Sequence, residues 1–370
     1  MNIIYILPRY DFFLKGRNGS VTHADGISQG LSENKVNLSI LSGPKSSEFT
    51  QANTHYLNTI SHPLVWFFKF FLLVVNFAYT KKHDVVIIRF STKYSLIISL
   101  VFSILGHKKW GYELNSFNYP YLKNKYKKGL IKRIEYWALK RAKFVNTVSD
   151  ALTDEVKTVN KTSFTLPNAG PSIISRRYEK RDEKDTFESK LNIIYMGAIR
   201  DYFDVEMMVT QCSKIEGVHF HIFGKLGLLS TLDQKIFESK NCTYYGEYSL
   251  DTIFDNSIFK ERFLLSLPYK KGTVAEIGSP TKLFEYLSLG MPIISSKVGQ
   301  PYELLKKANE EIGEFSFFYD DEESLSSILK SLSDSSIYFN HEGILEYYLN
   351  NHTWSIRCKQ YLQKLNLAVQ

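Results

Sequence analysis

The fold is decided by residues 279–294, which read Ser279-Pro280-Thr281-Lys282-Leu283-Phe284-Glu285-Tyr286-Leu287-Ser288-Leu289-Gly290-Met291-Pro292-Ile293-Ile294. This order predicts a loop, one helix, a tight turn and a buried strand. A single carboxylate, Glu285, lies on the apolar helix, where burial is unfavourable unless a partner meets the charge. The start of the helix offers free N–H groups and a positive dipole end to an anion. A sugar on the carboxylate and a phosphate at the helix tip would satisfy both features, so the stretch indicates a nucleotide-sugar site.

The whole-chain numbers fit a globular protein of two domains. The chain has 370 residues, of which 44% are hydrophobic and 23% charged. Its formal net charge of +8 indicates an anionic partner, which is a phosphate group, an acidic membrane surface or nucleic acid. No nucleic-acid-binding motif accompanies the charge, so we expect no nucleic acid partner. The cysteines Cys212, Cys242 and Cys358 are far apart, which favours a reducing compartment and structural thiols.

The N-terminal residues Met1–Pro8 form a short apolar run without a basic leader or a small-residue cleavage site. This pattern predicts a first β-strand and no signal peptide. We therefore expect a cytoplasmic protein.

Strands and helices alternate along both halves of the chain, which predicts two parallel doubly wound sheets. Expected strands of the first half are 2–7, 36–41, 85–89, 110–114 and 144–148, and those of the second half are 192–197, 218–223, 243–245, 263–267 and 292–295. A helix is expected over 21–33, and another over 353–365. We expect an N-terminal domain over 1–170, a charged linker over 171–190, a second domain over 191–352, and a final helix over 353–370. Two such domains would face each other across a cleft.

Two loops outside the deciding stretch are candidate phosphate sites. Gly19 and Ser20 lie in a loop before a helix, where glycine allows a ligand to approach the backbone, although a plain tight turn is equally compatible. Arg200 follows the strand that ends at Gly197 and could clamp a diphosphate, or it could be a solvated loop arginine. Lys282 is a cation in the first turn of a helix, an unusual position that makes it a candidate phosphate ligand, although a plain surface lysine is equally compatible.

The deciding stretch resembles the signature of retaining GT-B glycosyltransferases, close to glycosyltransferase family 4. Further segments resemble that family in matching order and cover nearly the whole chain: Val145–Ser149, Leu166–Gly170, Tyr195–Gly197, Phe223–Gly224, Leu267–Tyr269 and Thr353–Trp354. The resemblance implies two Rossmann-like domains, a final helix, 353–370, that crosses back to the first domain, and a nucleotide diphosphate sugar as co-substrate without a further cofactor. No Asp-x-Asp follows a strand in this sequence, so we expect no metal.

The resemblance also implies roles for particular residues. Glu285 matches the second Glu of the Glu-x7-Glu motif, which binds the donor ribose. The first Glu falls at Ile277, so that half of the motif is missing and the adjacent Glu276 is its expected substitute. Asn115 stands where a strand end usually carries a His. It could hydrogen-bond the transferring sugar but cannot shuttle protons.

The candidate site residues fall into two sets. The predicted catalytic set is Asn115, Glu113, Arg200 and Lys282, and the predicted donor-binding set is Gly19, Ser20, Gly197, Arg200, Glu276, Ser279, Pro280, Thr281, Lys282, Leu283 and Glu285. The expected reaction is transfer of a sugar to a glycan or lipid-linked acceptor in surface polysaccharide or glycolipid synthesis. Three alternatives stay open: a nucleotide-sugar epimerase using His23 and Glu113, an inactive nucleotide-binding scaffold, and an inverting transferase on the same fold.

Two segments raise the question of a membrane. Residues 63–79 are strongly apolar, but Lys69 and Asn76 interrupt them, so a packed helix of the first domain is favoured over a membrane span, with burial in the bilayer interface as a third possibility. The run Lys123–Lys143 mixes basic and aromatic residues and predicts either a solvated helix face or contact with anionic lipid. A lipid-linked acceptor on the inner membrane face would explain both segments.

Overall fold

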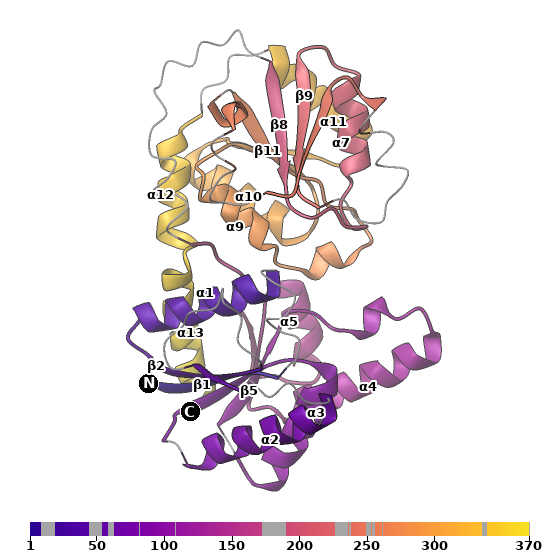
Figure 1. Cartoon of the computed structure of the whole chain (residues 1–370). Coiled ribbons are helices and arrows are strands. Elements are labelled where there is room, and N and C mark those ends of the chain that lie inside the picture. Colours follow the sequence, from indigo (N-terminus) through magenta and orange to yellow (C-terminus); the bar gives the residue numbers. More distant parts are fainter. Residues whose placement is uncertain are drawn as a thin grey trace. The chain divides into compact units, whose positions relative to one another are not determined.

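The computed structural model describes residues 1–8, 19–43, 54–57, 63–80, 82–107, 109–171, 190–225, 236, 238–248, 253, 256–260, 262–334 and 339–369 (Figure 1). The chain divides into two compact units. The first unit contains Met1–Gly170, Ile277–Thr281 and Thr353–Gln370, and the second contains Pro171–Glu276 and Lys282–His352. Most of the expected linker, residues 172–189, lies outside the described residues.

The first unit is built on a seven-stranded parallel sheet of order β3-β2-β1-β4-β5-β6-β7. Its strands are β1 (Asn2–Leu7), β2 (Asn37–Ser42), β3 (Thr54–Tyr56), β4 (Val85–Arg89), β5 (Trp110–Leu114), β6 (Phe144–Thr147) and β7 (Ser163–Thr165). Its helices are α1 (Gly19–Glu33), α2 (Pro63–Thr80), α3 (Thr92–Ile104), α4 (Lys125–Arg141), α5 (Asp150–Lys157) and α13 (Trp354–Val369), with a 3-10 turn at Tyr119–Tyr121.

Alternation along β1 explains why helices cover both faces of this sheet. Successive strand residues point to opposite faces. Tyr5 and Leu7 join the core beneath α1 and α13, whereas Ile4 and Ile6 join the core beneath α2, α3 and α4. Figure 1 shows α1 and α13 on one side of this sheet and α2 and α3 on the other.

The second unit has a six-stranded parallel sheet of order β10-β9-β8-β11-β12-β13 around one hydrophobic core. Its strands are β8 (Leu191–Met196), β9 (Val218–Phe223), β10 (Cys242–Gly246), β11 (Phe263–Leu267), β12 (Ile293–Ser296) and β13 (Ser316–Tyr319). Its helices include α7 (Val205–Ser213), α9 (Thr281–Leu287), α10 (Gly299–Ile312), α11 (Glu322–Asp334) and α12 (His341–Asn351), with 3-10 turns at Ser257–Lys260 and Val274–Ile277.

Two doubly wound α/β sheets are therefore confirmed, and all ten expected strands form. Three short strands, β3, β7 and β13, were not predicted from the sequence. One local expectation was wrong: Gly19 and Ser20 are the first two residues of α1 instead of a loop before it. Helix α1 therefore begins two residues before the expected start at Val21.

Candidate functional site

The carboxyl ends of β8, β9 and β10 form a tight backbone floor in the second unit. Gly197 follows β8 and donates an N–H hydrogen bond of 2.7 Å to Phe223 O, and Gly224 donates one of 2.7 Å to Gly246 O. Gly197 and Gly224 have φ angles of 135° and 142°, which other residues rarely adopt. A Cβ atom on Gly224 would lie 2.1 Å from Gly197 O. Only glycine fits this close packing, at the strand ends where open parallel sheets bind ligands.

Helix α9 is fixed to this floor by Tyr286. The Tyr286 hydroxyl is fully buried and accepts a hydrogen bond of 2.9 Å from Met196 N, at the end of β8. Lys282 and Glu285 are three residues apart on α9, so their side chains share one helix face. The sequence stretch that decides the fold thus brings a cation and a carboxylate to the end of β8.

The Lys282 ammonium is the most unusual group at this site. Its Nζ lies 3.9 Å from the centre of the Tyr195 ring and 4.3 Å from that of Phe203. It is buried and has no hydrogen-bond partner among the described residues. Burial lowers the pKa of Lys282 to about 7, against the opposing effect of Glu285. A Cβ atom on Gly197 would lie 2.5 Å from Nζ, so the glycine makes room for this cation.

Tyrosines that were not among the predicted site residues surround the Lys282–Glu285 pair. Burial is the main cause of the raised pKa of Tyr248 and Tyr269, and the Glu285 charge raises both further. The buried Tyr269 hydroxyl has no hydrogen-bond partner in the described part of the chain. Each of Tyr195, Tyr248 and Tyr269 lies within two residues of the end of a strand, and this position was the available signal.

Glu276, the expected substitute for the missing carboxylate, serves its own loop. It is exposed and accepts a hydrogen bond of 2.7 Å from Gly272 N. Ile277, which occupies the position of the absent Glu, accepts a hydrogen bond of 2.6 Å at its carbonyl from the Ser149 hydroxyl.

The turn expected to cradle phosphates, Ser279 to Leu283, is anchored to the first unit at its start. Ser279 accepts hydrogen bonds from the backbone N–H and the side-chain amide of Asn168. Pro280 and Thr281 are half-buried and group with the first unit. The Leu283 side chain is fully buried in the core of the second unit, so only its backbone could meet a donor.

Arg200 is exposed in the loop after Gly197 and makes no ion pair within the described residues. Asp204, which could have held this arginine away from a ligand, instead caps α7 by accepting a hydrogen bond of 3.3 Å from Met207 N. Arg200 therefore presents its guanidinium to solvent close in sequence to the glycine floor.

In the first unit, Glu113 lies in the core between the sheet and α1. It accepts hydrogen bonds of 2.8 Å from both Tyr5 and Arg89, and His23 Nε2 lies 3.1 Å away. Burial alone would raise the pKa of Glu113, but His23, Arg89 and the hydrogen bonds lower it to about 2. His23 also contacts Asn168 through Nδ1. With 0% of its surface exposed, Glu113 offers no solvent-facing atom to a substrate in this state.

Asn115 follows β5 and is half-buried, and its Oδ1 has no hydrogen-bond partner in the part of the first unit that the structure describes. Gly19 is exposed, and a Cβ atom there would meet nothing within 4 Å, so this position does not require a glycine for packing. The structure thus gathers Gly197, Lys282 and Glu285 at one strand end, and it leaves Gly19, Ser20 and Asn115 in the other unit.

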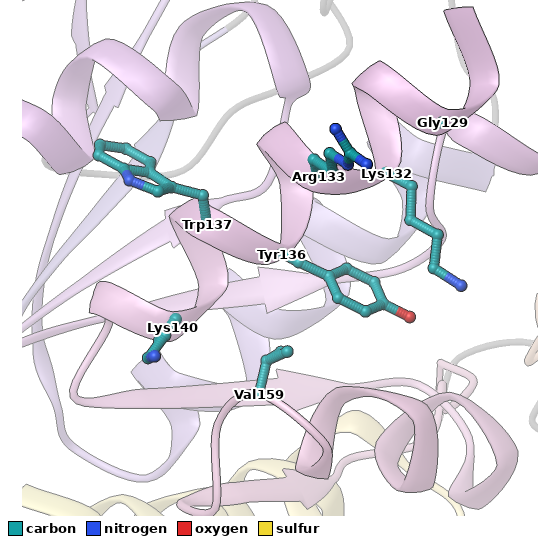
Figure 2. A pocket seen from close by; sticks show the side chains of 7 residues that line it. All are labelled: Gly129, Lys132, Arg133, Tyr136, Trp137, Lys140 and Val159. Atoms are coloured by element: carbon teal, nitrogen blue, oxygen red, sulfur yellow. The ribbon is translucent and has the colours of Figure 1, made fainter. Parts of the chain in front are cut away.

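A shallow groove of about 470 Å³ lies along α4 in the first unit (Figure 2). Tyr136, Trp137 and Val159 form its apolar part, and Lys132, Arg133 and Lys140 add positive charge. Within the described residues, no helix combines the length and the apolar character that crossing a bilayer requires. No three His, Cys, Asp or Glu side chains gather as a metal site in the described ranges.

Neither a protein-family model nor a curated protein sequence matches this chain. Solved structures do match over nearly the whole length. The chain is similar to HepE of Anabaena in complex with UDP-glucose, with a TM-score of 0.70, 12% identity, and 99% of this chain and 100% of HepE covered. It is also similar to the apo form of the lipopolysaccharide outer core galactosyltransferase WaaB, with a TM-score of 0.68, 15% identity and 99% of each chain covered.

A glycosyltransferase from Rickettsia africae matches with a TM-score of 0.69 and 13% identity, over 100% of this chain and 98% of that one. At this level of identity the similarities show the fold. The two Rossmann-like units and their strand orders are those of the GT-B fold.

Proposed function

We propose that this chain is a retaining, metal-independent glycosyltransferase of the family 4 type. It would move a sugar from a nucleotide diphosphate sugar to a glycan or lipid-linked acceptor in the synthesis of a surface polysaccharide or glycolipid. The solved structures that it resembles include HepE with UDP and UDP-glucose and the galactosyltransferase WaaB, which supports a nucleotide sugar as donor.

One observation carries the proposal: the unpartnered Lys282 ammonium lies beside Glu285 at the glycine floor after β8. A buried cation without a hydrogen-bond partner is unfavourable, and an anionic ligand would offset this cost. A carboxylate next to it can accept two hydrogen bonds from a ribose diol. A nucleotide diphosphate supplies both groups: a diphosphate for the Lys282 cation and a ribose diol for the Glu285 carboxylate.

The roles follow from this arrangement. Glu285 would bind the ribose hydroxyls, and Lys282 would bind the diphosphate together with the Ser279–Leu283 backbone. Arg200, exposed after Gly197, would close over the phosphates as a two-point donor. Glu276 would need to release Gly272 N before it could reach the donor sugar.

In the proposed reaction the acceptor oxygen attacks the sugar on the face from which the diphosphate leaves. The bond between the anomeric carbon and the diphosphate oxygen breaks while the bond to the acceptor oxygen forms, and the acceptor proton passes to the departing phosphate. Catalysis then consists of positioning and of stabilising charge on the leaving group. Lys282 and Arg200 supply this stabilisation, and Asn115, with its free Oδ1, would hydrogen-bond the transferring sugar.

Glu113 receives a positioning role in this proposal, because it is buried and bound to Arg89 and Tyr5. A lipid-linked acceptor would bring the enzyme to the inner face of a membrane, where the basic face of α4 would contact anionic lipid.

The test is a screen of uridine, guanosine and adenosine diphosphate sugars by thermal shift, followed by measurement of nucleoside diphosphate release. The Glu285→Ala variant should weaken donor binding by about 10- to 100-fold, the usual weight of hydrogen bonds to a charged group. The Glu303→Ala variant removes an exposed carboxylate on α10 and should bind like the wild type. Full donor affinity and turnover in Glu285→Ala would overturn the role of this residue.

A catalytically inactive nucleotide-binding scaffold is the second candidate, because Ile277 replaces one carboxylate and Glu276 is engaged in its own loop. Tight donor binding without release of product, across a panel of acceptor sugars and lipids, would favour it. The epimerase alternative requires His23 and Glu113 to reach a substrate, and formation of an epimer from the donor alone would support it.

A further inference from the structure

Exposed apolar side chains concentrate in one helical layer of the first unit. Of the sixteen large hydrophobic side chains exposed among the described residues, twelve fall between residues 64 and 130. They are Leu64, Val65, Phe68, Leu72, Tyr79, Ile97, Leu100, Ile104, Leu105, Tyr121, Tyr126 and Leu130. Scattered apolar residues are normal on a protein surface, but a contiguous patch marks an interaction site.

The outward face of α2 is apolar where a solvated helix would be polar. Its exposed residues recur at the spacing of one helix face, and Leu64, Phe68 and Leu72 are 63%, 65% and 66% exposed. Lys69 is the only charged residue of α2. The opposite face of α2 packs into the core of the first unit through Trp66 and Phe70.

Helix α3 repeats this arrangement beside α2. Ile97, Leu100 and Ile104 are exposed at helical spacing, whereas its serines Ser95 and Ser99 are buried. The two helices pack together: the Phe67 ring on α2 stacks on Tyr94 of α3 with centroids 5.1 Å apart. We call the exposed apolar residues of α2 and α3 (Leu64, Val65, Phe68, Leu72, Ile97, Leu100 and Ile104) the apolar band.

Positive charge borders the apolar band. Helix α4 packs against α3 and carries seven basic residues, Lys125, Lys127, Lys128, Lys132, Arg133, Lys140 and Arg141. Its one acidic residue, Glu135, is buried and accepts a hydrogen bond from Thr92. Across α2, α3 and α4, every charge that the structure shows exposed is therefore positive.

We propose that the apolar band inserts into the interfacial region of an anionic lipid bilayer, with the basic face of α4 resting on the lipid headgroups. Apolar residues that penetrate the headgroup boundary and cations that attract anionic lipid are the two signals that stable peripheral binding requires. The exposed tyrosines Tyr79, Tyr121 and Tyr126 suit the same boundary, where aromatic residues with a polar end are enriched.

The positive charge around the apolar band favours an anionic bilayer over a second copy of the chain as its partner. Two copies joined through this surface would bring like charges together without an exposed acid in these helices to offset them. A bilayer with anionic headgroups meets both the apolar band and its positive border.

The inference rests on the proposed contact of α4 with anionic lipid and adds insertion by α2 and α3. The test is flotation of the full chain with vesicles of phosphatidylcholine alone and of phosphatidylcholine containing phosphatidylglycerol. The wild type should float with the anionic vesicles, less so at high salt. Phe68→Gln combined with Leu72→Gln should reduce binding by about tenfold or more, because the inserted apolar area is lost.

Two controls are matched to this variant. Leu349→Gln with Leu367→Gln removes two exposed leucines from α12 and α13 and should bind like the wild type. Unchanged unfolding midpoints show that all variants fold, and unchanged donor hydrolysis without vesicles separates this test from the proposed reaction.

The possible outcomes distinguish insertion by α2 and α3 from electrostatic contact by α4. Wild-type binding by the Phe68/Leu72 variant would overturn insertion but leave electrostatic contact by α4. Absence of wild-type binding to anionic vesicles would overturn both, without bearing on glycosyl transfer to a soluble acceptor. Concentration-dependent dimerisation in light scattering that the Phe68/Leu72 variant abolishes, without vesicle binding, would assign the apolar band to a second copy and overturn the proposal.

Discussion

The Lys282 ammonium stores unfavourable energy in the ligand-free protein, because burial among Tyr195 and Phe203 gives it no hydrogen-bond acceptor. Lys282→Met keeps the length of the side chain and removes the charge. We expect this variant to be more stable than the wild type by about 1–3 kcal/mol near pH 7, the weight of a buried unsatisfied polar group. Chemical denaturation measures the difference, and the same variant should lose donor binding.

The pH dependence tests the cause of this effect. Because burial lowers the folded-state pKa of Lys282 from 10.5 to about 7, the unfolded chain binds more protons between these values. Wild-type stability should therefore rise from pH 7 toward 10.5, and the advantage of Lys282→Met should shrink over this window. Lys330→Met, at an exposed position on α11, should show no such trend. A Met variant less stable than the wild type at pH 7 would contradict this account.

Glu113 is a buried negative charge that stabilises the first unit. Glu113→Gln leaves the buried Arg89 without a countercharge, so we expect a loss of about 3 kcal/mol of unfolding free energy at pH 7. The folded-state pKa of Glu113 is lowered from 4.5 to about 2, so this contribution is complete above pH 4.5 and is lost as the pH falls toward 2.

Acid titration of the unfolding free energy for both proteins checks this prediction. The wild type and Glu113→Gln should differ most above pH 4.5 and converge near pH 2. The Glu303→Gln variant, at an exposed carboxylate, should follow the wild type throughout. Parallel curves for the wild type and Glu113→Gln below pH 4.5 would show that Glu113 does not titrate as described.

At this scale, the sequence predicted what local spacing determines. Lys282 and Glu285 are three residues apart on a helix, and their shared face follows from helical periodicity. The tyrosines around them come from strand ends far apart along the chain, and no local pattern shows which of these ends meet. The engagement of Glu276 with Gly272 N likewise depends on the path of a loop.

Among the helices, α1 and α13 illustrate how close packing decides the effect of a single methyl group. A Cβ atom on Gly30 of α1 would lie 2.4 Å from the backbone oxygen of Trp354, whereas one on Gly129 of α4 would meet nothing within 4 Å. We expect Gly30→Ala to destabilise the protein by about 1–3 kcal/mol through overpacking. Gly129→Ala should stabilise it by about 0.5–1 kcal/mol through helix propensity.

The two variants share one chemical change inside a helix, so each is the control for the other. Unfolding free energies from denaturant titration should change in opposite directions. Stabilisation by both substitutions would mean that α13 does not pack on α1 as tightly as described.

The elements themselves were largely predictable from hydrophobic runs and glycine or proline boundaries. All ten expected strands form, and most of them are apolar runs buried on both faces of parallel sheets, whereas the edge strand β10 is only partly buried. The missed strands, β3, β7 and β13, have only three or four residues each, and strands this short show little alternation to detect. Helix α2 shows the opposite difficulty. The apolar residues of its outward face resemble core residues in the sequence, but the structure shows them exposed.

Across the whole molecule, the chain leaves the first unit at Gly170, rejoins it briefly at Ile277–Thr281 and returns to it finally at Thr353. Trp354 N donates a hydrogen bond of 3.2 Å to Gly170 O, so the exit and the return lie side by side. Helix α13 then contributes Trp354, Tyr361 and Leu365 to the core beneath α1. The resemblance to a known family predicted this return, whereas composition and periodicity give no sign of it.

This discontinuity predicts how the first unit behaves when isolated. A fragment of residues 1–170 lacks α13, and the buried side chains Trp354, Tyr361 and Leu365 contribute about 1.5–3 kcal/mol each. Their sum is comparable to the entire stability of a domain, so we expect this fragment to show no cooperative unfolding.

Joining residue 170 to residue 353 through a short Gly/Ser linker should restore a cooperative transition, because the two positions are neighbours. The matched control joins residue 170 by the same linker to α13 carrying Trp354→Ala, Tyr361→Ala and Leu365→Ala, and thermal circular dichroism compares the three chains. Cooperative unfolding of residues 1–170 alone would show that the first unit does not need the returning helix.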